Sequence, residues 1–159
     1  MSIKRSDLLL SYWGKGGYPS QWMEPEDIAE TYKVHTFLIE QLLDRYKIER
    51  RTNYHYCHKA VWDVLCSEWN MVFKDDFDYR TKLNNVNVDF FLKSESIGIT
   101  LVDNTDQTIT NEDWYGESCL ARFAVGDIEV LQEGIREFLS QYDVKKKVEG
   151  PANEDGNEW

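Results

Sequence analysis

The chain of 159 residues is poor in the side chains that build disulfides and metal sites, with three cysteines and three histidines. Cys57, Cys66 and Cys119 form an odd, widely spaced set, which fits a reducing cytoplasm better than a disulfide framework. The chain also lacks any apolar run of about 18 residues, so we expect no membrane span. Its opening apolar stretch is too short for a secretory signal. These absences predict a cytoplasmic protein.

The short motifs of common catalytic sites are absent as well. Gly14, Gly16 and Gly17 have no predicted strand before them, so they do not indicate a phosphate-binding loop. Neither G-x-S-x-G nor H-E-x-x-H occurs in the sequence. We therefore expect no cofactor, and we favour a protein without enzymatic activity.

Basic residues are scarce relative to acidic ones, and the net charge of −11 by itself argues against DNA binding. The imbalance belongs to one part of the chain. Residues 1–60 contain nine Lys/Arg and eight Asp/Glu, whereas residues 61–159 contain nine Lys/Arg and twenty-one Asp/Glu. An acidic second part must face away from DNA, contact a basic partner or imitate nucleic acid.

Residues 25–51 predict two short helices joined by a tight turn. Pro25 suits a first helical position, and Glu26 and Asp27 follow in the first turn, where the helix dipole favours acids. The helical rhythm breaks at Lys33 and Val34. It then restarts with apolar residues at helical spacing, namely Ile39, Leu42, Leu43 and Tyr46.

This order of residues resembles the helix-turn-helix of bacterial and phage DNA-binding proteins. Ala29 matches the small residue where the two helices cross, and Val34 matches the apolar residue after the turn. Ile39 and Leu42 match the buried pair of the second helix. Lys33 stands where the family usually has glycine, so the resemblance implies a lysine in a left-handed turn.

The resemblance implies that the second helix enters the major groove of DNA. Its outward residues would be Thr36, Phe37, Glu40, Gln41, Asp44 and Arg45. Gln41 can pair with adenine, and Arg45 with guanine or a phosphate. The predicted DNA-binding residues are Lys33, Thr36, Gln41, Arg45, Lys47, Arg50 and Arg51, of which the lysines and the last two arginines would hold phosphates.

Two acids on the same helix oppose this interpretation. Glu40 and Asp44 would repel the duplex unless they pair with cytosine amines or with Arg45. The alternative interpretation is a plain helical hairpin that packs into the core with a solvated charged face.

Two further helices flank this segment. Residues 7–13 predict a supporting helix, and residues 53–69 predict a helix with an apolar face. The second of these gathers His55, Cys57 and His58 in its first turns, with Cys66 later. These are zinc-ligand types, but their spacing matches no compact ligand pattern, so we expect no metal site.

Beyond residues 73–84, where we place the domain boundary, the hydrophobic period changes from helical to alternating. Strands are expected at 86–92, 97–101 and 120–125, and a helix from Asp127 to Tyr142. Residues 104–116 are expected to form a polar loop. The predicted fold is therefore α+β: a three-helix helix-turn-helix-like domain at 1–72, an acidic domain with a three-stranded sheet and C-terminal helix at 85–144, and a disordered tail at 145–159.

The layout of residues 86–142 also resembles, more weakly, the core of the PD-(D/E)xK nucleases. Asp89 falls where that family keeps its first metal-binding aspartate, and Arg122-Phe123 followed by Asp127 resembles its late strand and helix. Where the family has E-x-K, this chain has Thr100-Leu101-Val102, and neither Asp103 nor Asp106 is accompanied by a lysine. The resemblance therefore implies a degenerate relative that does not cleave DNA.

Three functions follow from these patterns. The first is a DNA-binding regulator of phage or bacterial type that binds double-stranded DNA, with an acidic domain for dimerisation or contact with a protein partner. The second is an acidic inhibitor or immunity-type protein, including phage anti-defence, that blocks a nucleic-acid enzyme. The third and least favoured is a metal-dependent nuclease built on Asp89.

Overall fold

The computed structural model describes residues 3–83, 86–102, 111–115 and 118–146. The chain divides into two compact units, residues 1–52 and 53–159, which we call unit 1 and unit 2 and describe separately. The boundary predicted at 73–84 lies instead inside unit 2, because the helix predicted at 53–69 contacts the C-terminal helix and the strand that begins at Phe77.

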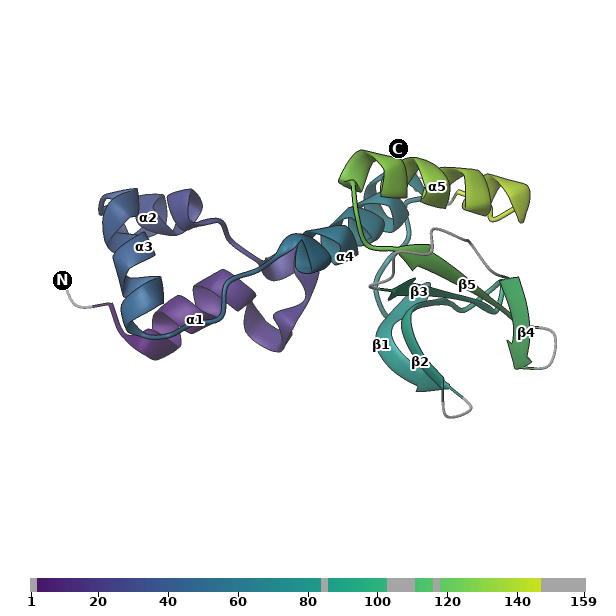
Figure 1. Ribbon diagram of the computed structural model, residues 1–159, viewed down its shortest axis with the longest axis horizontal. Coiled ribbons are helices and arrows are strands. Elements are labelled where there is room, and N and C mark those ends of the chain that lie inside the picture. The colour runs from purple at the N-terminus through teal and green to yellow at the C-terminus, as the bar shows by residue number, and fades with distance from the viewer. Residues whose placement is uncertain (1–2, 84–85, 103–110, 116–117, 147–159) are drawn as a thin grey trace, which may run out of the picture. The chain divides into compact units, whose positions relative to one another are not determined.

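Helices are the only regular secondary structure in the described part of unit 1 (Figure 1). Its elements are α1 (Arg5–Trp13), the short turns η1 (Lys15–Gly17) and η2 (Pro19–Gln21), α2 (Pro25–Tyr32) and α3 (Thr36–Arg45). The predicted two-helix segment is thus present, with Pro25 at the first position of α2. His35 is the N-cap of α3, and its ring Nδ1 accepts a hydrogen bond from the backbone N–H of Phe37 at 3.1 Å.

The apolar faces of these helices meet in one core. Its buried members are Ile3, Leu8, Tyr12, Ile28, Ala29, Ile39, Leu42, Leu43 and Ile48. Ala29 leaves room for α2 and α3 to pack closely, and Val34 is half-buried against the same core. Burial of this apolar surface, rather than intrinsic helix propensity, stabilises such short helices.

Both helices α2 and α3 end on a lysine in the left-handed conformation. Lys33 has a φ of 58° and a ψ of 45°, and Lys47 has a φ of 57°. At the first of these turns the N–H of Val34 donates to the carbonyl of Ala29 at 3.0 Å, and the N–H of Lys33 donates to Glu30 at 3.2 Å. This is the Schellman pattern of hydrogen bonds, which turns the chain sharply after a helix.

Unit 2 combines two helical segments with a mixed sheet. In chain order it contains α4 (Asn53–Asp63), the π-helical turn η3 (Val64–Glu68), β1 (Phe77–Leu83), β2 (Val86–Leu92), β3 (Ile97–Val102), β4 (Asn111–Tyr115), β5 (Ser118–Ala124) and α5 (Ile128–Gln141). The strand order is β1-β2-β3-β5-β4, with β3 and β5 parallel and the other pairs antiparallel.

The predicted strands β2, β3 and β5 and the helix α5 are confirmed, but the prediction of a three-stranded sheet is wrong, since the described residues form five strands. β1 lies within residues 73–84, where the domain boundary was predicted. β4 lies within residues 104–116, which were expected to be a loop. The predicted tail at 145–159 lies outside the described residues except for Lys145 and Lys146.

Helices α4 and α5 pack on the same face of the sheet (Figure 1). Trp62 of α4 contacts Phe77 of β1 edge-on at 5.3 Å between ring centroids, and Phe138 of α5 contacts Phe123 of β5 at 5.6 Å. The side-chain amide of Gln132 joins the helices by donating to the Ala60 carbonyl at 3.2 Å. In the described part of the chain, no helix is long and apolar enough to cross a bilayer.

The left-handed lysine after α2 yields a stability prediction. Lys33→Gly should raise the free energy of unfolding of unit 1 by about 0.5–1 kcal/mol, because glycine adopts positive φ without the steric penalty of a Cβ. Lys33→Ala is the matched control, since it removes the same charge but keeps the Cβ. Urea unfolding of the two variants measures the difference, and equal stability of the glycine and alanine variants would contradict the assigned turn.

Candidate nucleic-acid interface

The turn at Lys33 leads the chain into α3 with one face of that helix on the core. Ile39 and Leu43 are fully buried and Leu42 is nearly so. On the opposite face Gln41, Asp44 and Arg45 are exposed to solvent, together with the apolar Phe37. The second helix therefore has one buried face and one solvent-exposed face directly after a tight turn. Both the helix-turn-helix interpretation and the alternative of a plain helical hairpin with a solvated charged face share this arrangement.

Four predicted DNA-binding residues lie on or beside this exposed face, and a fifth is half-buried. The exposed residues are Lys33, Gln41, Arg45 and Lys47, and the half-buried residue is Thr36 at the first position of α3. Lys33 and Lys47 stand at the two turns that bound α3, one at each end. We call these five residues the α3 face.

Glu40 and Asp44, the two acids of α3, pair with an arginine other than the one that the sequence suggested. The Arg50 guanidinium forms a hydrogen-bonded ion pair with Glu40 and a second, longer contact with Asp44 at 3.5 Å. Burial of Arg50 opposes its charge, but the hydrogen bond to Glu40 and the negative charges of Glu40 and Asp44 together raise the pKa of the guanidinium. The sequence suggested Arg45 as the partner of these acids. Since Arg50 pairs with them instead, Arg50 is not a free phosphate contact.

Arg51 lies inside unit 1 and is not available for a phosphate, contrary to the sequence prediction. Its side chain is fully buried and stacks on the Tyr12 ring at 3.8 Å. The guanidinium donates to the carbonyls of Tyr12 and Met23, the latter at 2.8 Å, and pairs with Glu24 at 3.1 Å. Arg51 therefore fastens the segment after α3 to α1 and to the start of α2.

Neighbouring contacts hold this segment in the same way. Trp13 donates from its indole N–H to the carbonyl of Glu49 at 2.9 Å, and Tyr46 donates from its hydroxyl to Ile3 at 2.6 Å. The sequence predicted phosphate contacts for the basic stretch that ends at Arg51. Arginine stacks on aromatic faces, and Tyr12 and Trp13 lie far from Arg51 in the sequence, so only the fold brings these groups together.

The nuclease-like position of unit 2 has one aspartate, and that carboxylate serves the sheet. Asp89 accepts a hydrogen bond from the backbone N–H of Leu101 at 2.8 Å. Burial raises the pKa of Asp89, while the hydrogen bond and the nearby Arg80 oppose that rise. Thr100, where the family has its acid, is in register with Arg122 on β5. Asp103 and Asp106 lie outside the described residues.

Two of the four residues of zinc-ligand type, Cys57 and His58, have other hydrogen-bond partners. Cys57 donates from its thiol to the Gly126 carbonyl at 3.5 Å, and the Nδ1 of His58 is hydrogen-bonded with the Tyr79 hydroxyl at 3.0 Å. Among the residues that the structure describes, no group of three or more His, Cys, Asp or Glu side chains could hold a metal ion.

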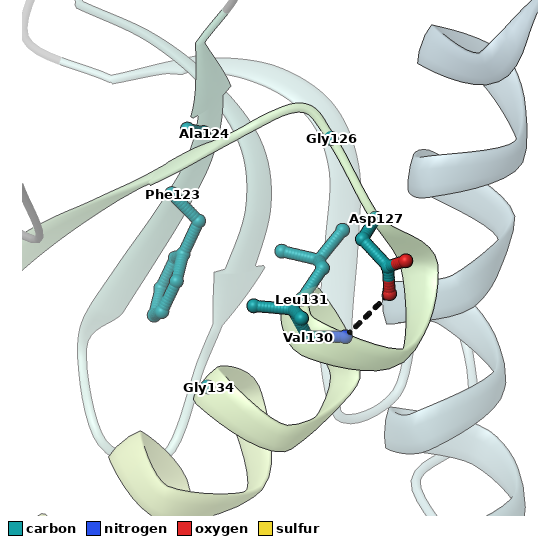
Figure 2. Close-up of a pocket in the computed structure, with 7 residues that line it drawn as sticks. All are labelled: Phe123, Ala124, Gly126, Asp127, Val130, Leu131 and Gly134. Atoms are coloured by element: carbon teal, nitrogen blue, oxygen red, sulfur yellow. Dashed lines mark hydrogen bonds between the residues drawn. The ribbon is translucent and has the colours of Figure 1, made fainter. Parts of the chain in front are cut away.

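A cavity of about 140 Å³ lies between the end of β5 and the first turns of α5 (Figure 2). Its lining is Phe123, Ala124, Gly126, Asp127, Val130, Leu131 and Gly134. The carboxylate of Asp127 accepts a hydrogen bond from the Val130 N–H at 3.1 Å and so caps α5. The remaining lining side chains are apolar. This pocket therefore offers shape but no reactive group.

Comparison of the chain with protein-family models, with curated proteins and with solved structures finds no match.

The position of Arg51 predicts a stability effect. Arg51→Ala should lower the free energy of unfolding of unit 1 by about 2–4 kcal/mol, because the change leaves buried carbonyls without donors and removes a buried ion pair. Arg50→Ala should cost less than about 1 kcal/mol, since that pair is partly exposed. Thermal or urea unfolding compares the two, and a larger loss for Arg50→Ala would overturn the assignment.

The environment of His58 predicts a pH dependence of unit 2. Burial lowers the pKa of His58 from 6.5 to about 4, so the folded state resists a proton that the unfolded state accepts. Stability from this group is full above about pH 6.5 and falls as the pH drops towards 4, by about 2 kcal/mol between pH 7 and pH 5.

The free energies of unfolding of wild type and His58→Gln, measured at pH 7 and pH 5, test the contribution of His58. The variant should lose clearly less stability over that interval. The pKa shift of Asp89 has the opposite sign and acts nearer its ordinary value of 3.8, so comparison with the variant isolates His58. Equal pH dependence in the two proteins would show that His58 does not carry the effect.

Proposed function

We propose that unit 1 binds double-stranded DNA by placing α3 in the major groove, and that the protein is a non-catalytic regulator. One observation carries the proposal. A left-handed turn at Lys33 presents a helix whose apolar side is buried and whose polar side, including Gln41 and Arg45, is exposed. Recognition helices of helix-turn-helix proteins contact base edges from such a face.

The exposed residues divide by chemistry into base readers and phosphate holders. Gln41 offers a paired donor and acceptor for adenine, and Arg45, one helical turn further on, offers two donors for guanine or one for a phosphate. Thr36 can reach a base edge or a phosphate from the first turn. Lys33 and Lys47 bracket α3 and hold phosphates without reading sequence.

The dimensions support this arrangement. Ten residues of α-helix extend about 15 Å, which is comparable with the major-groove width of about 12 Å. A helix of this length can lie in the groove, with Lys33 and Lys47 at its two ends available for the phosphates that border it. The Arg50 pairs with Glu40 and Asp44 offset the two acids that would otherwise repel the duplex.

Unit 2 is acidic, in contrast to the nearly neutral unit 1. Residues 53–159 contain ten Lys/Arg against twenty-one Asp/Glu, so this part is repelled by phosphates and serves dimerisation or contact with a protein partner. Its Asp89 carboxylate has no accompanying acid and lysine at Thr100-Leu101-Val102, which supports a role without DNA cleavage.

The same acidity favours a second candidate function, an inhibitor that blocks a basic nucleic-acid enzyme through unit 2. In that case affinity purification of the full chain should recover a stoichiometric basic protein. The interaction should survive Lys47→Gln and weaken with salt. Recovery of duplex DNA alone would favour the regulator.

A binding experiment tests the proposed function. The full chain should shift a random duplex pool at about 50 mM salt, with a log–log salt slope of about −2.7 for some three phosphate contacts from Lys33, Arg45 and Lys47. Lys47→Gln should reduce the slope to about −1.8 and weaken binding uniformly across sequences.

Lys145→Gln is the matched control, because it removes one exposed lysine from unit 2. This control should leave both affinity and slope unchanged. Absence of any shifted duplex with wild-type protein would refute the proposal, and an equal effect of the two lysine variants would refute the placement of the interface on α3.

A further inference from the structure

Two large apolar side chains of α3, Phe37 and Leu38, are exposed to solvent, and Phe37 is by far the more exposed. Phe37, in the first turn of the helix, is 63% exposed, whereas Phe77, Phe90, Phe123 and Phe138 are all buried. Phe37 contributes nothing to the core of unit 1, which Ile39, Leu42 and Leu43 provide on the opposite side of α3. A ring placed this way gains apolar contact only when something docks on it.

The position of Phe37 ties it to the proposed DNA contacts. Phe37, Gln41 and Arg45 are spaced by four residues, so they form a single column along the exposed face of α3. The ring lies at the N-terminal end of that column, where a recognition helix comes nearest to the base edges. The apolar group that the major groove offers there is the C5-methyl group of thymine.

We infer that Phe37 is a specificity-determining residue that packs on a thymine methyl group in the major groove. This inference rests on the proposed function and deepens it by assigning a base to one position of the site. It places thymine beside the base that Gln41 contacts, since the two side chains are one helical turn apart.

The surroundings favour DNA over a protein partner. Leu38, the neighbouring apolar residue, is 38% exposed, and beyond it the α3 face is polar and bracketed by Lys33 and Lys47. A stable protein interface needs an apolar centre of many residues, with about 800 Å² buried on each side. One aromatic ring between two lysines matches a methyl group flanked by phosphates.

Uracil substitution tests the inference directly, because deoxyuridine keeps the hydrogen bonds of thymine and lacks its methyl group. A duplex is first selected from a random pool by the full chain, and each thymine is then replaced singly. Wild-type protein should lose about fourfold in affinity at one thymine, the effect of burying about one methyl group. The Phe37→Ala variant should bind more weakly and show no loss at that position.

Leu10→Ala is the matched control, since Leu10 is an exposed leucine of α1 at 54%. It should keep the wild-type response to uracil. Retained duplex with equal affinity for thymine and uracil at every position would overturn this inference and leave the proposed function standing. Failure of the wild-type chain to retain any duplex would overturn both.

A second copy of the chain is the competing occupant of this surface. Sedimentation of wild type and Phe37→Ala without DNA distinguishes it. An unchanged mass supports the assignment to thymine, and a loss of self-association in the variant would overturn it.

Discussion

The arrangement of unit 1 depends on one hydrogen-bonded turn, in which Val34 donates to the carbonyl of Ala29 and Lys33 takes a left-handed backbone. This turn ends α2 and redirects the chain, so that α3 packs its apolar side on the core and leaves its polar side free. A residue other than glycine pays a steric penalty at such a position. The buried core of Ile28, Ile39 and Leu43 offsets it.

Some basic side chains of unit 1 stabilise its fold, and others are exposed to solvent. Two of the arginines that follow α3 serve the unit itself: Arg51 fastens the chain to Tyr12, and Arg50 neutralises Glu40 and Asp44. Three exposed cations, Lys33, Arg45 and Lys47, then remain beside the helix face. The proposed interface is therefore weakly charged, which makes base contacts by Gln41 and Phe37 important for affinity.

Local patterns predicted much of the fold. The period of apolar residues located α2, α3, β2, β3, β5 and α5, because each buries one regular face. β1 was missed although Phe77 and Tyr79 alternate with polar residues, because the predicted domain boundary at residues 73–84 covered it. The unit division at residues 52 and 53 depends on contacts between α4 and α5, which lie far apart in the sequence.

The candidate site was predictable in outline and not in its ion pairs. Helical spacing placed Gln41 and Arg45 on the exposed face, as the structure has them. The same reasoning could not place Arg50 or Arg51, because they lie outside the helix and their positions depend on how residues 47–51 return to α1. A basic cluster in a sequence does not reveal which charges reach solvent.

We propose above all that α3 is the surface that contacts DNA. Amide chemical-shift mapping of the full chain, titrated with a selected duplex, measures this most directly. The account predicts that shifts concentrate in residues 33–47, with those of β5 and α5 unchanged. Shifts confined to unit 2, or no shifts in α3 at saturating duplex, would contradict it.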